Sequence, residues 1–288
     1  MRTMKNTFRF CLIAALALPC ALFARRDEGL LLYMNFDDRA EPTKNISGTD
    51  REPQLLGPLS APKLDDGKFV YSAMFTNANT NRSVDSCAIN LGELDGYYQD
   101  SFSVAFWFRT EKKGSTEAMI TGNKNWDRKN EAGWALTTLK DETLSLTVGG
   151  KTVKIAFPQL TDGKWHHVAL VVNRKTNTVA LYGDGKCIGK PQAIPAGTIG
   201  KGGDEGNETL VGSSGNGYYA LPGDKNKKAL VDDYAIWKRA LTEKEIVAMW
   251  KEGDGARVPE PSAFPLIFGG IALAAALAFA RRGRKKQK

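Results

Sequence analysis

The chain has 288 residues, of which 42% are hydrophobic and 25% are charged, a balance that supports a folded core and excludes a disordered or collagen-like protein. Its formal net charge of +8 lies at the two ends: residues 1–24 carry +3, residues 259–288 carry +5, and residues 25–258 sum to zero. Nucleic-acid binding needs clustered positive charge against phosphates, so the neutral central part argues against a nucleic-acid partner.

The N-terminal residues have the three parts of a secretory signal peptide. Three basic residues precede an uncharged apolar run over residues 10–23, which ends at small residues. We therefore expect residues 1–24 to be a signal peptide that is cleaved after Ala24, and the rest of the chain to be exported.

Between the two ends, short apolar runs alternate with turn residues, without a long segment of helical period. This pattern predicts an all-β fold in which two antiparallel sheets pack as a sandwich. Pairs such as Gly149-Gly150 and Asp184-Gly185 mark tight hairpin turns. In chain order, the expected strands cover residues 30–36, 69–75, 87–91, 102–109, 118–121, 133–139, 143–148, 153–157, 165–172, 178–182, 209–212 and 229–237.

One short helix is expected after the last strand. Thr242 and Glu245 have the spacing of a capping box, in which each side chain bonds the other's backbone amide. Apolar residues at 246, 247, 249 and 250 then form one helical face, which we expect to pack on the sandwich.

Residues 254–262 form a linker that ends in the triplet Pro259, Glu260 and Pro261. Residues 263–280 follow without a charge, and as a helix they would span roughly 27 Å, close to the thickness of a bilayer core. Six of the eight residues in 281–288 are Lys or Arg, which the positive-inside rule keeps in the cytoplasm. The expected topology is a C-terminal transmembrane helix with a basic cytoplasmic tail and an exported domain.

A Pro-Glu-Pro triplet, a short apolar span and an Arg-rich end, in that order, resemble the PEP-CTERM sorting signal of Gram-negative bacteria that make extracellular polymer. The resemblance implies an exosortase-type partner that recognises the triplet and processes the tail, leaving the protein released or transferred to the cell surface. The alternative is a plain membrane anchor, in which Pro259 and Pro261 only end the preceding structure.

The central domain, residues 29–253, resembles the laminin G-like (LamG-like), concanavalin A-like jelly rolls of bacterial surface proteins. The segments that carry this resemblance come in family order: LLLYMNFD at 30–37, FSVAFWFR at 102–109, DGKWHHVA at 162–169 with the hairpin up to residue 187, and LVDDYAIWKRALT at 230–242. The resemblance implies the fold and leaves the ligand open, because this fold hosts lectins, glycosidases and inert spacers.

The sequence offers little for catalysis. His166 and His167 are neighbours on an expected strand, so they point to opposite faces and cannot share one site; we expect one ring in the core and the other on the sheet surface. The pair of carboxyl groups that glycoside hydrolysis requires is approached only by Glu93 and Asp95, without a second glutamate at the expected spacing. We therefore expect no enzyme activity.

Two kinds of binding site are candidates. Carboxylates near both ends of the domain could hold Ca²⁺ if the first and last strands pair, namely Asp37, Asp38, Asp232 and Asp233. A second oxygen-rich loop lies in the glycine-rich stretch 198–217, although flexibility is the simpler explanation of its glycines; its oxygen-bearing residues are Asp204, Glu205, Asn207 and Glu208. Loop aromatics could stack on sugars or pack under loops instead, and these are Tyr97, Tyr98, Trp126, Tyr218 and Tyr219.

After signal cleavage the chain keeps two cysteines, Cys87 and Cys187. Export to an oxidising space permits a disulfide between them, and two free buried thiols are the alternative.

These features together favour a surface-associated, non-catalytic module of the cell envelope that binds a glycan or extracellular polymer. A passive structural or adhesive matrix protein is the main alternative. A glycoside hydrolase with an unfamiliar site is the third.

Overall fold

The computed structural model describes the parts of the chain that carry the central domain. These are residues 28–54, 63–76, 88–92, 94–110, 117–125, 127, 132–138, 143–157, 159–197, 199–200, 208–214, 219–221 and 228–252. The chain divides into two compact units, Met1–Ala256 and Arg257–Lys288. The expected signal peptide, PEP motif, transmembrane helix and basic tail lie outside the described residues and stay predictions. Among the helices that are described, none is long and apolar enough to cross a membrane.

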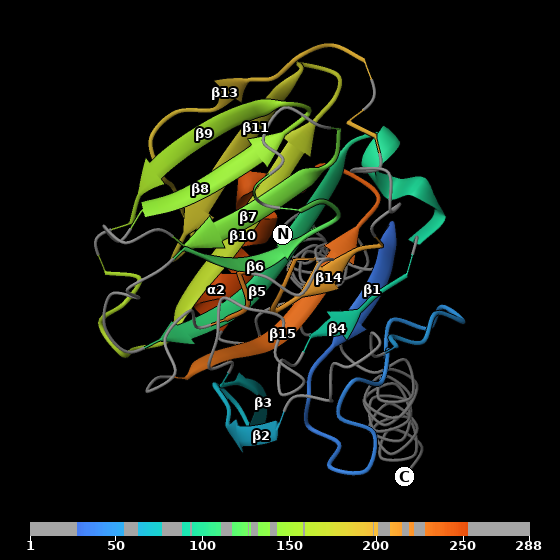
Figure 1. Cartoon of the computed structure of the whole chain (residues 1–288), viewed down its shortest axis with the longest axis vertical. Coiled ribbons are helices and arrows are strands. Elements are labelled where there is room, and N and C mark those ends of the chain that lie inside the picture. The colour runs from blue at the N-terminus through green and yellow to red at the C-terminus, as the bar shows by residue number, and fades with distance from the viewer. Residues whose placement is uncertain are drawn as a thin grey trace, which may run out of the picture. The chain divides into compact units, whose positions relative to one another are not determined.

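The described strands form two antiparallel sheets that face each other (Figure 1). Sheet A contains β1 (Leu30–Met34), β2 (Lys63–Asp66), β3 (Tyr71–Phe75), β5 (Phe102–Thr110), β10 (His166–Asn173), β11 (Thr178–Gly183), β12 (Lys186–Cys187), β13 (Gln192–Ala193) and β15 (Ala229–Trp237). Sheet B contains β4 (Ile89–Asn90), β6 (Ala118–Gly122), β7 (Trp134–Thr138), β8 (Thr143–Val148), β9 (Lys151–Ala156) and β14 (Leu210–Val211). The predicted all-β sandwich is confirmed.

Apolar side chains from both sheets fill one continuous core. Phe106 of β5 stacks on Tyr234 of β15, with ring centroids 5.7 Å apart. The hydroxyl of Tyr234 lies 2.7 Å from that of Thr121 on β6, so a hydrogen bond joins the two sheets through the core. Trp134 of β7 is fully buried and packs on Phe102 at 5.4 Å.

The last strand, β15, organises sheet A. One of its edges pairs with β5, while the other pairs with β3 along residues 229–231 and with β1 along residues 234–237. The register shifts between Asp232 and Ala235, and Asp233 has a φ of +49°, so a bulge marks the change from one neighbour to the other.

All twelve predicted strands are present with changes at their ends, and three further strands in the described residues were not predicted. β2 was not predicted because its sequence, KLDD, is mostly charged and lacks an apolar alternation. β12 and β13 have two residues each, too short for a periodic signal. The predicted Gly149-Gly150 turn is confirmed: both residues have positive φ, and they join β8 to β9 as a two-residue hairpin.

The predicted helix is present as α2 (Glu243–Glu252), on the side of sheet A that faces away from sheet B (Figure 1). Its capping box is formed, because Glu245 accepts a 2.7 Å bond from the Thr242 amide and the Thr242 hydroxyl accepts from the Glu245 amide at 3.3 Å. Arg239 donates twice to the same Glu245 carboxylate, at 2.7 and 3.2 Å, which fixes the helix to the end of β15.

Candidate functional site

Two of the predicted sugar-stacking aromatics belong to the core. Tyr97 and Tyr98 lie in the 3-10 helix η1 (Leu94–Gln99) and are buried. The Tyr97 hydroxyl accepts from Trp134 Nε1 at 2.8 Å and lies 2.9 Å from the Thr209 hydroxyl. The expectation that these two rings are exposed for a ligand is therefore corrected: they pack under a loop.

The other aromatic candidates are only partly described. Tyr219 is half-buried against Met119 and Ala135 of sheet B, and its backbone carbonyl accepts from the Met119 amide at 2.7 Å. Trp126 and Tyr218 lie outside the described residues, and their role in binding stays a prediction.

The four aspartates proposed for calcium come from strands that do pair, as expected, because β1 lies beside β15. The buried Asp232 accepts from the backbone amides of Lys68 and Asp233, both at 2.8 Å. Asp233 accepts from the Tyr33 hydroxyl at 2.7 Å, and Asp37 from the Tyr71 amide at 3.2 Å. Burial, with the nearby charge of Asp37, raises the pKa of Asp232 to about 7.

Asp232 and Asp233 therefore stabilise the bulge in β15, and Asp37 holds the start of β3. The fourth, Asp38, is exposed and accepts from the Ala40 amide at 2.8 Å. No group of three or more His, Cys, Asp or Glu side chains in the described segments is arranged to hold a metal ion. Calcium binding stays a prediction.

The two histidines occupy opposite faces of β10, and both are buried, so the expectation that one lies on the surface is corrected. His166 contacts Asp184 through Nδ1 at 2.8 Å and Asp162 through Nε2 at 3.0 Å. These two carboxylates raise its pKa. His167 packs on Trp107, with centroids 5.3 Å apart, and burial lowers its pKa to about 4. Among the described contacts, none joins either histidine ring to the side chain of a serine or cysteine.

Cys187 is half-buried and forms no disulfide with any residue that the structure describes, and burial raises the pKa of its thiol. Cys87 lies outside the described residues, so the disulfide stays a prediction.

A polar pocket of about 240 Å³ opens at the β4 edge of sheet B. Its lining comes from three distant segments: Asp50, Arg51, Glu52 and Gln54, then Asn90 to Gly92, and Glu208. The backbones of Gln54 and Asn90 exchange two hydrogen bonds of 2.6 Å, which extends the sheet by one bridge and places the polar segment 50–54 beside β4.

The buried amide of Asn90 organises the polar pocket. Its Oδ1 accepts from the Gly92 amide at 2.9 Å, and its Nδ2 donates to the carboxylate of Glu208. The side chains of Asp50, Glu52 and Gln54 are exposed at the rim. Planar carboxylate and amide groups of this kind can accept and donate hydrogen bonds to the hydroxyl groups of a small polar ligand.

Sequence reasoning missed most of this pocket. Glu208 belongs to the predicted oxygen-rich loop, but residues 50–54 carry no periodic or spacing signal. Residues 50–54 reach the pocket because the backbone of Gln54 pairs with that of Asn90, which is 36 residues away in the sequence.

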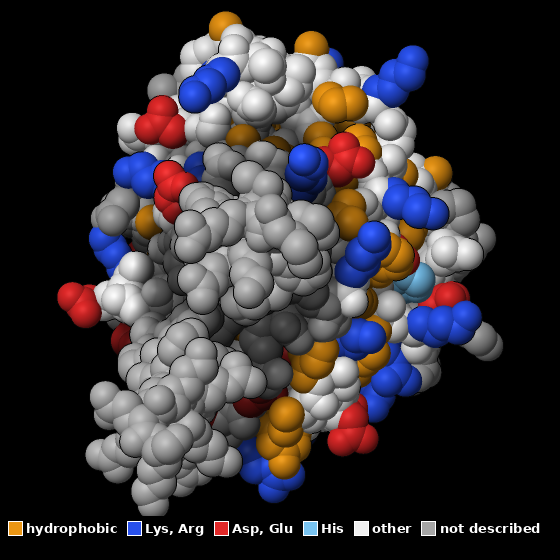
Figure 2. Space-filling view, turned by 180° about the vertical axis from the view of Figure 1, so that it is seen from behind, with side chains coloured by type: hydrophobic (Ala, Val, Ile, Leu, Met, Phe, Trp, Pro, Cys, Tyr) orange, Lys and Arg blue, Asp and Glu red, His pale blue; other side chains and the backbone are white. Residues whose placement is uncertain are grey.

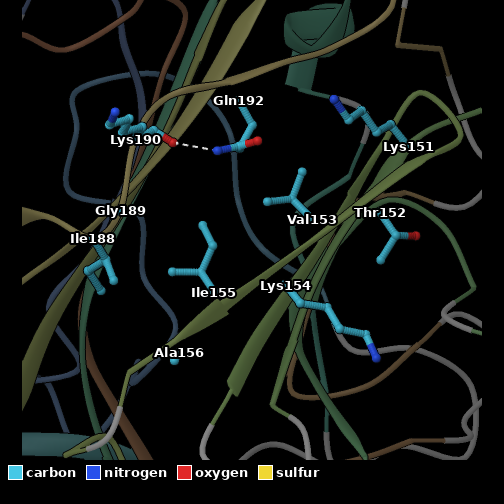
Figure 3. Close-up of a pocket in the computed structure, with 10 residues that line it drawn as sticks. All are labelled: Lys151, Thr152, Val153, Lys154, Ile155, Ala156, Ile188, Gly189, Lys190 and Gln192. Carbon is cyan, nitrogen blue, oxygen red and sulfur yellow. Dashed lines mark hydrogen bonds between the residues drawn. The ribbon is translucent and has the colours of Figure 1, made fainter.

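A second depression, the edge groove, has a volume of about 500 Å³ (Figure 3). It is lined by the six residues of β9 and by Ile188, Gly189, Lys190 and Gln192, and thus contains three lysines and no acidic residue. On the face seen in Figure 2, by contrast, Lys and Arg side chains alternate with acidic and apolar ones.

Residues 81–247 match the family model Laminin_G_3, described as the concanavalin A-like lectin/glucanases superfamily. The chain belongs to this superfamily. The predicted family resemblance of the domain is thereby confirmed, while its ligand is not determined by membership, since members differ in what they bind.

Similar proteins include the non-toxic nonhemagglutinin of Paraclostridium bifermentans, which is 31% identical over 160 residues. That match covers 54% of this chain and 13% of the relative. Among solved structures, the binding domain of Paraclostridial Mosquitocidal Protein 1 has a TM-score of 0.59 at 18% identity, covering 79% of this chain and 53% of its own. A structure of botulinum neurotoxin type C, described with two ganglioside molecules, has a TM-score of 0.56 at 15% identity, covering 80% and 52%.

The chain therefore spans about an eighth of the curated relative and about half of these solved chains. At these identities the solved structures show that the fold is shared.

Proposed function

We propose that this protein is an exported, surface-associated and non-catalytic module that binds a glycan, with the polar pocket as its sugar site. The proposal rests on the polar side chains that line the pocket at the β4 edge, where Asn90 donates a hydrogen bond to Glu208. A pocket of about 240 Å³ is large enough for one sugar ring, and its carboxylate and amide oxygens are suited to accept bonds from hydroxyl groups.

Family membership and the relatives support a binding role. The relatives named above include a binding domain and a neurotoxin described with ganglioside, a class of ligand that contains sugar. Two of the groups that could have suggested catalysis have a role in the fold instead: His166 is held by two aspartates, and Asp232 accepts bonds from backbone amides. We therefore expect no release of reducing sugar from any glycan that binds.

A glycan array with the purified full-length protein tests the proposal, followed by titration of the best ligand against variants of the pocket. Glu52→Ala and Glu208→Gln each remove an acceptor and should weaken binding about tenfold, while the melting temperature changes little for the exposed Glu52. Glu28→Ala is a control, because Glu28 is also an exposed glutamate but lies before β1 of sheet A and does not line the polar pocket.

Two results would contradict the glycan proposal. If no soluble or polymeric glycan binds, the passive matrix role takes its place. If a glycan binds and neither pocket variant weakens it, the site lies elsewhere, and the loop aromatics Trp126 and Tyr218 become the residues to change next.

Sorting through the C-terminal tail is part of the proposal. With Pro259 and Pro261 changed to Ala in a host that has an exosortase, the unprocessed protein should accumulate in the membrane with its C-terminus intact. Processing that is unchanged in this variant would leave a plain membrane anchor as the role of the tail.

A further inference from the structure

The edge groove follows the open edge of β9, the last strand of sheet B. Val148 and Lys151 flank the two-residue turn, so they form a hydrogen-bonded pair, and the bonding alternates along the hairpin. Residues 151, 153 and 155 therefore bond to β8. The backbone N–H and C=O groups of Thr152, Lys154 and Ala156 point to the opposite side, where no described strand pairs with β9.

Successive side chains of β9 point to opposite faces of sheet B. Val153 and Ile155 face the edge groove toward Ile188, while Lys154 points away from them (Figure 3). Lys151 closes one end of the groove, because its Nζ donates to the carbonyl of Ala193 across the gap. Four of the six residues of β9 are exposed.

An added strand would meet two different surfaces. Its side chains alternate between the faces, so one set enters the edge groove beside Val153 and Ile155, and the other lies beside Lys154. Lys190 stands on the far rim, and no carboxylate lines the groove to neutralise these ammonium groups. The surface therefore matches a strand whose apolar residues alternate with acidic ones.

A second copy of this chain fits poorly. Antiparallel pairing of two β9 edges over their full length, with residue 152 opposite 156, places Lys154 directly opposite Lys154 of the other copy. Like charges in directly opposed positions destabilise a strand pair, and an edge lysine is a common protection against self-association.

We propose that β9 accepts an extended acidic polypeptide strand from a partner protein, which continues sheet B and fills the edge groove with its apolar side chains. A peptide suits the site better than an acidic polysaccharide does, because the backbone groups of β9 that point away from β8 repeat every second residue and match those of another strand. This interaction is separate from the glycan site at the β4 edge.

The test uses the purified full-length protein and a labelled heptapeptide of alternating Val and Glu, with binding read by fluorescence anisotropy. The peptide should bind, and Lys154→Glu should weaken binding about tenfold or more. A Val-Lys peptide should bind the Lys154→Glu variant better than it binds the parent. Lys63→Glu is the matched control, because Lys63 is an exposed lysine on the edge strand β2 of the other sheet and should leave binding unchanged.

Methylation of alternate backbone amides of the Val-Glu peptide keeps its charge and removes its strand donors, so it should abolish binding. Three results would overturn the proposal. These are no binding at about 1 mM peptide, equal binding by the Lys154→Glu variant, and binding that survives amide methylation. If polygalacturonate binds with the same dependence on Lys154 while the peptide does not, the groove is a site for acidic polysaccharide.

Discussion

Nδ1 of His166 lies 2.8 Å from an oxygen of Asp184, which follows β11, the next strand along the chain. The other oxygen of Asp184 accepts from the backbone amide of His167 at 2.9 Å. One carboxylate thus fixes both members of the histidine pair, and it connects the start of β10 with the turn between β11 and β12.

This contact predicts a loss of stability at alkaline pH. The pKa of His166 is raised from 6.5 in the folded state, so its contribution to stability is complete below about pH 6.5 and is lost as the pH rises through the raised pKa. The denaturant concentration at the midpoint of urea unfolding should therefore decrease as the pH rises above about 6.5. In His166→Gln this decline should be smaller, and an unchanged pH profile in that variant would show that the contact contributes nothing.

His167 predicts the opposite trend at acid pH. Burial lowers its folded pKa from 6.5 to about 4, so the unfolded state takes up a proton first and stability falls as the pH decreases from about 6.5 to 4. Replacing it in His167→Leu keeps the apolar contact with Trp107 and should flatten this part of the profile. A parallel profile for parent and variant between pH 4 and 6.5 would contradict the prediction.

The core predicts a large effect at Trp134. This residue is fully buried, so Trp134→Ala should lower the free energy of unfolding by about 3 to 5 kcal/mol, because a cavity forms in the centre of sheet B. Val70→Ala is the comparison, since Val70 is 50% exposed and should change stability by less than about 0.5 kcal/mol. Urea denaturation of both variants measures the difference, and equal values would contradict the placement of Trp134.

Tyr97→Phe separates packing from ligand contact. Loss of the hydroxyl leaves the buried Nε1 of Trp134 without its acceptor, at a cost of about 1 to 3 kcal/mol. Affinity for a glycan should stay at the parent value when it is measured well below the melting temperature. Weaker binding with unchanged stability would restore Tyr97 as a ligand residue.

Calcium removal is the simplest test of the predicted metal site. The oxygens of Asp232 and Asp37 accept bonds from backbone amides, and an ion would compete with these bonds. If the predicted ion is absent, a chelator should leave the melting temperature unchanged in differential scanning calorimetry. A clear decrease that added Ca²⁺ reverses would show that an ion stabilises the folded state.

The sequence predicted the fold better than the binding surface, for physical reasons. The strand pattern and the capping box depend on residues close in sequence, so the spacing of Thr242 and Glu245 alone was enough to pair them correctly. The polar pocket depends on chain segments that meet only after folding, such as residues 50–54 and Asn90. No local pattern identifies residues of that kind.

Burial was the other source of error. Tyr97 was a candidate for an exposed loop, whereas its ring lies in the core and packs on Phe102 and Trp134. The charge of Asp232 and Asp233 suggests an ion site. The position of both residues in the bulge of β15, where they stabilise two neighbouring strands, depends on the sheet order and could not be read from the sequence.

The placement of β15 has a consequence for how the domain acquires its structure. β1, β3 and β5 all use β15 as a neighbour, yet β15 ends at Trp237, about 200 residues after β1. During synthesis these strands have no common partner until β15 has been made. Long-range closures of this kind slow folding to milliseconds or seconds. A chain shortened before residue 229 would leave three apolar strands with open edges, so it should aggregate where the complete chain folds.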